Sequence, residues 1–160
     1  RKGGKYINEK PDPKITSGKF DELKIHLKKL KEIVNPRLAK EVKKLAADGD
    51  FSENAAYQIA KGKLRGANQK IKELEDFLGK AEIIKTSDNL LIQIGHKVRL
   101  QLEDKEIKYQ ILGSSEVNLS KGIISHQSPL GHALLGKGVG ETAELRVGGQ
   151  IVRYKVLNIE

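Results

Sequence analysis

The chain has 160 residues, of which 38% are hydrophobic, and its 30 lysines and arginines outnumber its 21 acids. It contains no cysteine, which excludes disulfides, thiolate metal sites and thiol chemistry. No apolar run approaches the roughly 18 residues of a membrane-spanning helix and no signal peptide opens the chain, so we expect a cytoplasmic protein of one or two small domains without a membrane partner.

The positive charge is concentrated in the first half of the chain. Residues 1–80 hold 20 Lys and Arg against 12 Asp and Glu, a net charge of +8, whereas residues 81–160 hold 10 against 9. A basic half joined to a near-neutral half favours an acidic partner, such as nucleic acid, for the first half only. The alternative is a pair of well-solvated, lysine-rich helices with no such partner.

Residues 1–14 are predicted to form a flexible arm, because they contain Gly3-Gly4 and the prolines Pro11 and Pro13. The chain holds no methionine, even at position 1, so we expect its N-terminus to have been trimmed or processed.

Residues 15–80 are predicted to form an antiparallel, coiled-coil helical hairpin. Apolar residues recur there at spacings of three and four on both sides of a short acidic turn at residues 48–54. The two seams are Phe20, Leu23, Leu27, Leu30, Val34, Leu38, Val42 and Leu45, then Ala60, Leu64, Ala67, Ile71, Leu74 and Leu78. The first helix would extend about 45 Å. Pro36 leaves two alternatives: it kinks one continuous helix, or Asn35 caps a second one.

Residues 81–160 are predicted to form a small domain on an antiparallel sheet, which makes the whole chain α+β. The apolar period becomes two, and Gly148-Gly149 has the composition of a two-residue hairpin turn. The expected strands contain Val98-Leu100-Leu102, Ile107-Tyr109-Ile111, Ala143-Leu145-Val147 and Val152-Tyr154-Val156. A short helix over residues 129–135 interrupts them.

The acidic turn holds the most informative pair of side chains, Asp50 and Glu53. One interpretation is structural: Asp50 as the N-cap and Glu53 three residues later form a capping box for the second helix. The other is that both carboxylates point outward and hold a hard divalent cation such as Mg²⁺. Two carboxylates are too few for a complete site, so they would complete a cation that another protein already holds.

The tip motif Gly49-Asp50-x-Ser52-Glu53-Asn54-Ala55-x-Tyr57 resembles that of the bacterial Gre transcript-cleavage factors. The run Lys61-x-x-Leu64-Arg65 fits their second helix. Further segments are similar to that family's C-terminal domain, in the expected order: Ile111-Leu112-Gly113, Gly122-Ile123-Ile124-Ser125, and Ser128-Pro129-Leu130-Gly131 with Gly136-Lys137. The resemblance covers roughly residues 14–160. Different motifs favour the A and the B type of Gre factor, and the subtype stays open.

The resemblance implies a specific role. Gre factors insert the hairpin into the secondary channel of bacterial RNA polymerase, and their FKBP-like C-terminal domain docks at the channel rim. Asp50 and Glu53 would help to hold a second Mg²⁺ beside the polymerase's own metal, so that the polymerase hydrolyses the backtracked RNA 3′ end. No cofactor would be bound stably by the chain alone, which we expect to be a monomer. The matched docking segment is Ser128, Pro129, Leu130 and Gly131.

Basic residues on both sides of the tip fit a path for RNA. Asn54 and Tyr57 match tip positions that support the geometry and contact RNA. Six cations are predicted to neutralise phosphates of the extruded strand: Lys40, Lys43, Lys44, Lys61, Lys63 and Arg65.

Three rival functions fit the sequence less well. A channel-binding regulator without cleavage would not need the intact Asp50 and Glu53 pair. An FKBP-like chaperone or isomerase needs an aromatic pocket, but residues 81–160 contain only Tyr109 and Tyr154 as aromatics. A plain coiled-coil nucleic-acid binder would not explain residues 128–137. The four histidines show no metal-ligand spacing, and Ser128 has no evident triad partners.

Overall fold

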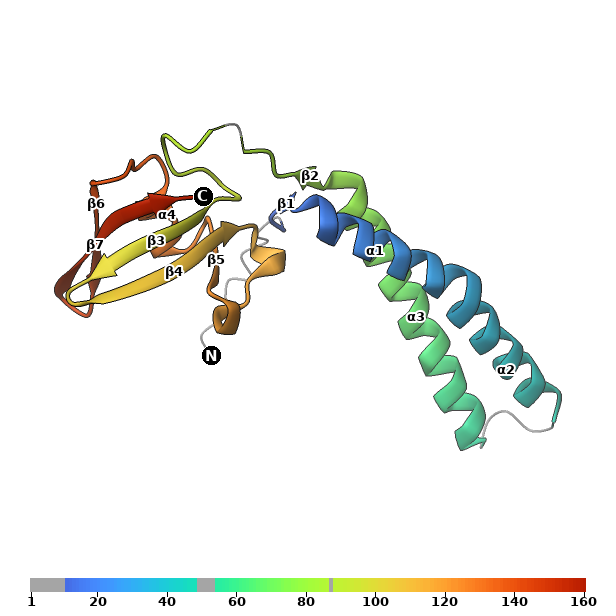
Figure 1. The fold of residues 1–160 in the computed structure, drawn as a ribbon. Helices are drawn as coiled ribbons and strands as arrows, with labels where there is room; N and C mark the ends of the chain where they lie inside the picture. The colour runs from blue at the N-terminus through green and yellow to red at the C-terminus, as the bar shows by residue number, and fades with distance from the viewer. Residues whose placement is uncertain (1–10, 49–53, 87) are drawn as a thin grey trace. The chain divides into compact units, whose positions relative to one another are not determined.

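The computed structural model describes residues 11–48, 54–86 and 88–160, which fold into two compact units (Figure 1). Residues 18–81 form a helical unit, and residues 82–160 form a sheet unit that also takes in the chain up to Ser17. The predicted boundary at residue 80 lies within one residue of this division. The predicted boundary at residue 14 differs from it, because the helical unit begins at residue 18. The described part of the predicted arm, from Pro11 onward, belongs to the sheet unit, and residues 1–10 lie outside the described ranges.

The helical unit is the predicted hairpin. Helix α1 (Ser17–Lys29), a π-helical segment η1 (Leu30–Val34) and α2 (Asn35–Ala47) follow one another, and α3 (Ala55–Lys80) packs alongside them (Figure 1). Every predicted seam residue is buried or half-buried, which confirms both apolar seams. Polar contacts also join the helices, from Lys31 Nζ to Glu75 Oε1 at 2.7 Å and from Asn35 Nδ2 to Asn68 Oδ1 at 2.8 Å.

The chain stays helical through Pro36, so the alternative in which Asn35 caps a separate helix is wrong. Asn35 has helical dihedrals (φ −62°, ψ −48°), and its N–H donates to the carbonyl of Leu30, five residues earlier. Proline lacks an N–H, and its ring crowds the carbonyl four residues before it. The wider π turn ahead of Pro36 relieves that conflict without ending the helix.

The sheet unit is built on a five-stranded sheet in the order β5-β4-β3-β7-β6 (Figure 1). Its strands are β3 (Lys97–Leu102), β4 (Lys105–Leu112), β5 (Ile123–Ser125), β6 (Thr142–Val147) and β7 (Gln150–Ile159). The four predicted strands and the Gly148-Gly149 turn are confirmed, with both glycines at positive φ. The prediction was an antiparallel sheet. The pairs among β3, β4, β6 and β7 are antiparallel, but the short strand β5 runs parallel to β4.

Short elements complete this unit. The 3₁₀ turns η2 (Ser114–Glu116) and η3 (Leu119–Lys121) follow β4, and helix α4 (Pro129–Leu134) agrees with the helix predicted at residues 129–135. A separate two-stranded parallel sheet pairs β1 (Lys14–Ile15) with β2 (Glu82–Ile83). This small sheet joins residues on either side of the hairpin and was not predicted.

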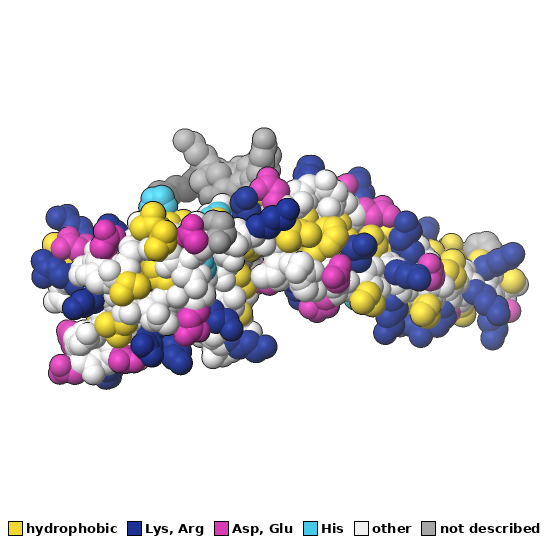
Figure 2. Space-filling model, turned by 45° about the horizontal axis from the view of Figure 1, so that its top comes forward, with side chains coloured by type: hydrophobic (Ala, Val, Ile, Leu, Met, Phe, Trp, Pro, Cys, Tyr) yellow, Lys and Arg dark blue, Asp and Glu magenta, His cyan; other side chains and the backbone are white. Residues whose placement is uncertain are grey.

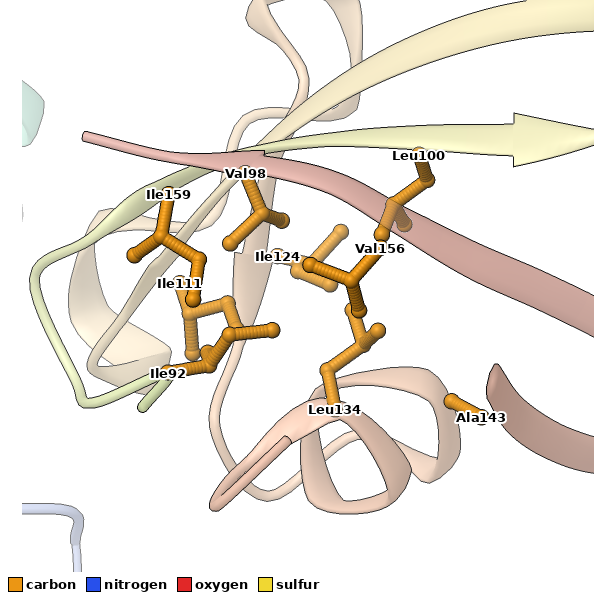
Figure 3. Close-up of a cluster of buried hydrophobic side chains, with 9 residues drawn as sticks. All are labelled: Ile92, Val98, Leu100, Ile111, Ile124, Leu134, Ala143, Val156 and Ile159. Atoms are coloured by element: carbon orange, nitrogen blue, oxygen red, sulfur yellow. The ribbon is translucent and has the colours of Figure 1, made fainter. Parts of the chain in front are cut away.

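The core of the sheet unit lies between the sheet and α4. Figure 3 shows Leu134 pointing from α4 toward Val156 of β7. The alternation predicted for the strands places one apolar face inward, and the buried cluster comes from the five strands, helix α4 and one loop. Its members are Ile92, Val98, Leu100, Ile111, Ile124, Leu134, Ala143, Val156 and Ile159. None of the helices in the described ranges is both long and apolar enough to span a membrane.

Candidate functional site

The predicted acidic pair lies outside the described residues, which resume at Asn54. Helix α3 begins at Ala55, and its N-cap is Asn54, whose side-chain oxygen accepts a hydrogen bond from the Tyr57 amide at 3.2 Å. The capping-box interpretation required Asp50 as the N-cap, so it is wrong. Asp50 and Glu53 precede the cap in sequence, and their metal-binding role stays a prediction.

Asn54 and Tyr57 are placed at the first turn of α3. Tyr57 is half-buried, and the ammonium of Lys61, one turn later, lies 5.8 Å from the centre of its ring. This is the distance of a cation–π contact, which orients the lysine beside the aromatic ring. Two residues predicted to contact RNA therefore contact each other.

The part of the hairpin next to the tip is strongly basic. The first 18 residues of α3, residues 55–72, contain no acid, and Glu41 is the only one in α2. All six predicted phosphate-binding residues are exposed, and none forms an ion pair with a carboxylate of the described residues. The same helical stretches hold three further cations that were not among the predicted residues: Arg37, Lys70 and Lys72.

Apart from Glu41 and Asp48, the acids in the described part of the hairpin lie toward its other end. Asp21, Glu22 and Glu32 belong to the first helical stretch, and Glu73, Glu75 and Asp76 to the last two turns of α3. The ion pair between Lys31 and Glu75 is found in this part. Figure 2 shows Lys and Arg side chains in dark blue along the visible face of the hairpin, with the acids in magenta. The hairpin thus has a cationic end toward the tip and a charge-balanced end away from it.

The predicted docking segment at α4 also stabilises the structure of the sheet unit. Ser128 is the N-cap of α4: its Oγ accepts from the Gly131 amide at 3.1 Å and donates to the Ser125 carbonyl at 2.7 Å. A Cβ on Gly131 would lie 2.1 Å from that same carbonyl, so only glycine fits. Leu130 packs against the core, whereas Pro129 is exposed. Packing explains part of this segment, and its docking role stays a prediction.

A buried carboxylate that the sequence analysis missed ties the N-terminal segment to the sheet unit. The side chain of Asp12 is 2% exposed, and four donors surround it. Its Oδ1 accepts from the Lys14 amide at 3.1 Å. Its Oδ2 accepts from the amide and hydroxyl of Ser114 at 2.8 and 3.1 Å, and His126 Nε2 lies 2.9 Å away. We call this group the Asp12 cluster.

The Asp12 cluster holds the N-terminal segment against the sheet unit through hydrogen bonds. Burial alone raises the pKa of Asp12, but hydrogen bonds from Ser114, Lys14 and His126 outweigh burial and hold the pKa below its ordinary value of 3.8. The Ser114 hydroxyl is bonded to Asp12 rather than to the imidazole, so the group lacks the order of a hydrolytic triad. Within the described ranges no three His, Cys, Asp or Glu side chains gather to hold a metal.

Comparison with known proteins identifies the family. Residues 14–83 match the model described as "Transcription elongation factor, N-terminal", and residues 88–160 match "Transcription elongation factor, GreA/GreB, C-term". Proteins named transcription elongation factor GreA are similar along most of their length. The one from Ruegeria pomeroyi is 36% identical over 91% of this chain and 96% of its own, and the one from Mesoplasma florum is 38% identical over 82% and 87%.

Among solved structures, a crystal structure of GreA factor homolog 1 (Gfh1) of Thermus thermophilus is 25% identical, covers 91% of this chain and 97% of its own, and has a TM-score of 0.42. The two family models together cover nearly all of the described chain, and they match the hairpin and the sheet domain in the predicted order. The chain therefore belongs to the GreA/GreB family of transcription elongation factors.

Proposed function

We propose that this protein binds bacterial RNA polymerase in the cytoplasm, as a monomer, and stimulates the polymerase to cleave backtracked RNA. The hairpin enters the secondary channel, and the tip reaches the RNA 3′ end. The protein acts as a cofactor, and the polymerase itself carries out the hydrolysis. Family membership supports the general role, and the arrangement of charge on the hairpin supports the way it acts.

The observation that carries the proposal is the contrast in charge at the tip. Asp50 and Glu53 are an acidic pair in sequence between two helical stretches that together hold nine cations and one acid. Solvation of a helix surface does not require acids and bases to be separated in this way. A cationic surface leading to two carboxylates is suited to guiding a polyanion toward a divalent cation.

Asp50 and Glu53 are the residues that would hold the cation. Carboxylate oxygens are the ligands that Mg²⁺ prefers, and two of them leave room for ligands from the polymerase and the RNA. The cation supplies charge stabilisation for the attacking and leaving oxygens of phosphodiester hydrolysis. Because Asn54 caps α3, neither acid is needed as its N-cap, and both can face a partner.

The remaining predicted residues fit around this centre. The cations of α2 and α3 neutralise phosphates of the displaced strand, and Tyr57 offers a ring that Lys61 already faces. The segment Ser128 to Gly131, held in place by its capping bonds, presents Pro129 to the polymerase.

The test uses stalled bacterial elongation complexes and the variants Asp50→Asn and Glu53→Gln. We expect release of short 3′ RNA fragments to fall by at least about a hundredfold in each variant, while binding to the polymerase is retained. Raising the Mg²⁺ concentration should restore part of the activity, because a weakened site fills by mass action. Asp48→Asn is the matched control, since it removes an exposed acid beside the tip that has no proposed ligand role.

Other outcomes would assign a different function. If wild-type protein binds the polymerase and alters elongation but releases no fragments, it is a channel-binding regulator without cleavage. If the double variant cleaves at the wild-type rate, the metal-binding role of the tip is refuted. Equal losses of cleavage activity in Asp48→Asn and Asp50→Asn would show that the tip acts through its overall negative charge and not by holding a metal.

A further inference from the structure

A second basic site lies on the sheet unit. The outer face of the sheet, opposite the core, carries a hollow of about 340 Å³ over β3 and β4. Four cations line it: Lys97 and Arg99 from β3, Lys108 from β4, and Lys121 from η3. All four are exposed, and they account for four of the ten cations in residues 81–160.

Strand register brings these cations together. Arg99 is directly opposite Lys108 in the antiparallel ladder, which places their Cβ atoms about 5 Å apart on one face. Lys97 lies two residues from Arg99 on the same face, about 7 Å along the strand. Like charges directly opposite each other destabilise a sheet. The pairing thus has an unfavourable charge arrangement unless an anion lies over it.

The fourth cation, Lys121, belongs to η3, which lines the hollow beside β4. Gly122 packs tightly against β4: its carbonyl accepts from the Gln110 amide at 2.8 Å, and a Cβ on it would lie 2.7 Å from the Lys108 carbonyl. Gly122 also has a positive φ of 69°. This close approach, which glycine permits, places Lys121 beside Lys108 at the edge of the sheet.

The two carboxylates nearby, those of Glu106 and Glu160, offset only part of the charge of the four cations. Glu106 Oε2 lies 3.9 Å from Arg99 Nε. Because both side chains are exposed to solvent, this ion pair is weak. Glu160 borders the hollow opposite Lys97 and keeps its negative charge, although its Oε1 is directed to Asn158 Nδ2 at 3.2 Å and forms no ion pair with the four cations. Within the described residues, Lys97, Lys108 and Lys121 form no ion pair with a carboxylate.

The distribution of charge indicates a compact anion. The hollow is bordered by Glu106 on β4 and by Glu160 beside Lys97, and the next residue on this face of β3 is the neutral Gln101, with Lys155 of β7 opposite it and outside the hollow. A nucleic-acid strand needs cations along its whole track, whereas the four cations here gather in one hollow over neighbouring parts of β3, β4 and η3. A guanidinium fork and three ammonium groups match adjacent phosphate groups that share several oxygens.

We propose that this hollow binds a small ligand with two or more adjacent phosphate groups, such as a pyrophosphate or the polyphosphate part of a nucleotide. Its volume is in the range of small-ligand pockets. The site is separate from the proposed tip chemistry, and it adds a ligand-binding function to the domain that carries the docking segment.

The experiment is an NMR titration of the full-length chain with inorganic pyrophosphate at low ionic strength, read at the backbone amides of Gln110 and Gly122. We expect saturable one-to-one shifts at these amides and at least tenfold weaker binding of orthophosphate. ATP should bind, and AMP should bind at least tenfold more weakly. Binding should weaken as salt is added.

Two variants and a matched control assign the site. Arg99→Gln and Lys108→Gln should each weaken pyrophosphate binding by about tenfold or more, and Lys108→Gln should not lower the melting temperature because it removes a like-charge contact. Lys155→Gln removes the same charge from the same sheet, opposite Gln101 and outside the hollow, and should leave binding unchanged.

Three results would overturn the proposal. The first is the absence of saturable shifts at Gln110 and Gly122 in the wild-type chain, which needs no variant. The second is equal affinity in Lys155→Gln, Arg99→Gln and Lys108→Gln, which would mean that pyrophosphate binds elsewhere, such as on the hairpin. The third is a short single-stranded RNA that shifts the same amides and displaces pyrophosphate with higher affinity, which would make the site a nucleic-acid contact.

Discussion

Replacing Asp12 by Asn is the most direct test of how the N-terminal segment is held. The substitution keeps the shape of the side chain but turns one carboxylate oxygen into an NH₂ donor. Both oxygens face donors in the structure, Lys14 on one side and Ser114 with His126 on the other. Whichever way the amide turns, at least one buried donor loses its acceptor and meets another donor.

The expected cost follows from that geometry. Leaving a buried donor without an acceptor costs about 1–3 kcal/mol, and a bond to a charged acceptor is at the upper end of that range. We therefore expect Asp12→Asn to lower the free energy of unfolding by about 2 kcal/mol at neutral pH. For a unit of this size that corresponds to a melting temperature lower by roughly 10 °C.

The cost should depend on pH with a definite sign. Because the folded pKa of Asp12 lies below its ordinary value of 3.8, the ionised carboxylate stabilises the folded state at every pH above that value. The contribution is lost as the pH falls through the folded pKa, where Asp12 becomes a neutral acid resembling the amide. The difference between wild type and Asp12→Asn should be constant above about pH 5 and should shrink below about pH 3.8.

Differential scanning calorimetry of both proteins over a pH series measures this. Glu82→Gln is the matched control, because Glu82 is exposed and its 2.6 Å ion pair with Lys14 is worth about 0–1 kcal/mol in solvent. Equal melting temperatures for wild type and Asp12→Asn at pH 7 would refute the anchoring role. A difference that persists unchanged in acid would show that shape, and not charge, is responsible.

Gly131→Ala should lower the free energy of unfolding by about 3 kcal/mol in urea denaturation, since its Cβ would collide with the Ser125 carbonyl and force α4 away from the core. Asn54→Ala should cost about 1 kcal/mol of local stability, seen as faster amide exchange in the first turn of α3, whereas unchanged exchange would show that the cap is dispensable. Charge reversal on the hairpin should reduce RNA cleavage most for long backtracked 3′ ends and flatten its salt dependence; equal losses for all RNA lengths would favour simple solvation. The residues to be changed to Glu are Lys61, Lys63 and Arg65.

Periodicity is what made much of the fold predictable. The seams of the hairpin and the alternating strands bury one face each, so their spacing is written in the sequence. The Gly148-Gly149 turn was equally clear, because two consecutive residues at positive φ favour glycine strongly. The acidic tip and its basic flanks were also found from sequence, because charge contrast needs no knowledge of tertiary contacts.

The unpredicted features depend on residues far apart in the chain. Asp12 meets Ser114 across 102 positions and His126 across 114, and nothing local to Asp12 signals a buried carboxylate. Strands β1 and β2 have two residues each, too few for a pattern. The π turn before Pro36 resolves a local conflict, but several other distortions could resolve it too. The cap at Asn54 was missed because Asp50 and Glu53 also fit a capping motif.

The pairing of β1 with β2 has a consequence for how this chain can be divided. In register, Ile15 lies beside Ile83, so the chain leaves for the hairpin and returns from it at neighbouring points of the same unit. The hairpin is thus an insertion into a discontinuous domain. A fragment that begins at residue 81 would lack β1 and Asp12 and would not represent that domain. Replacing residues 18–81 by a short linker would keep both halves, and another hairpin could be transplanted between the same two strands.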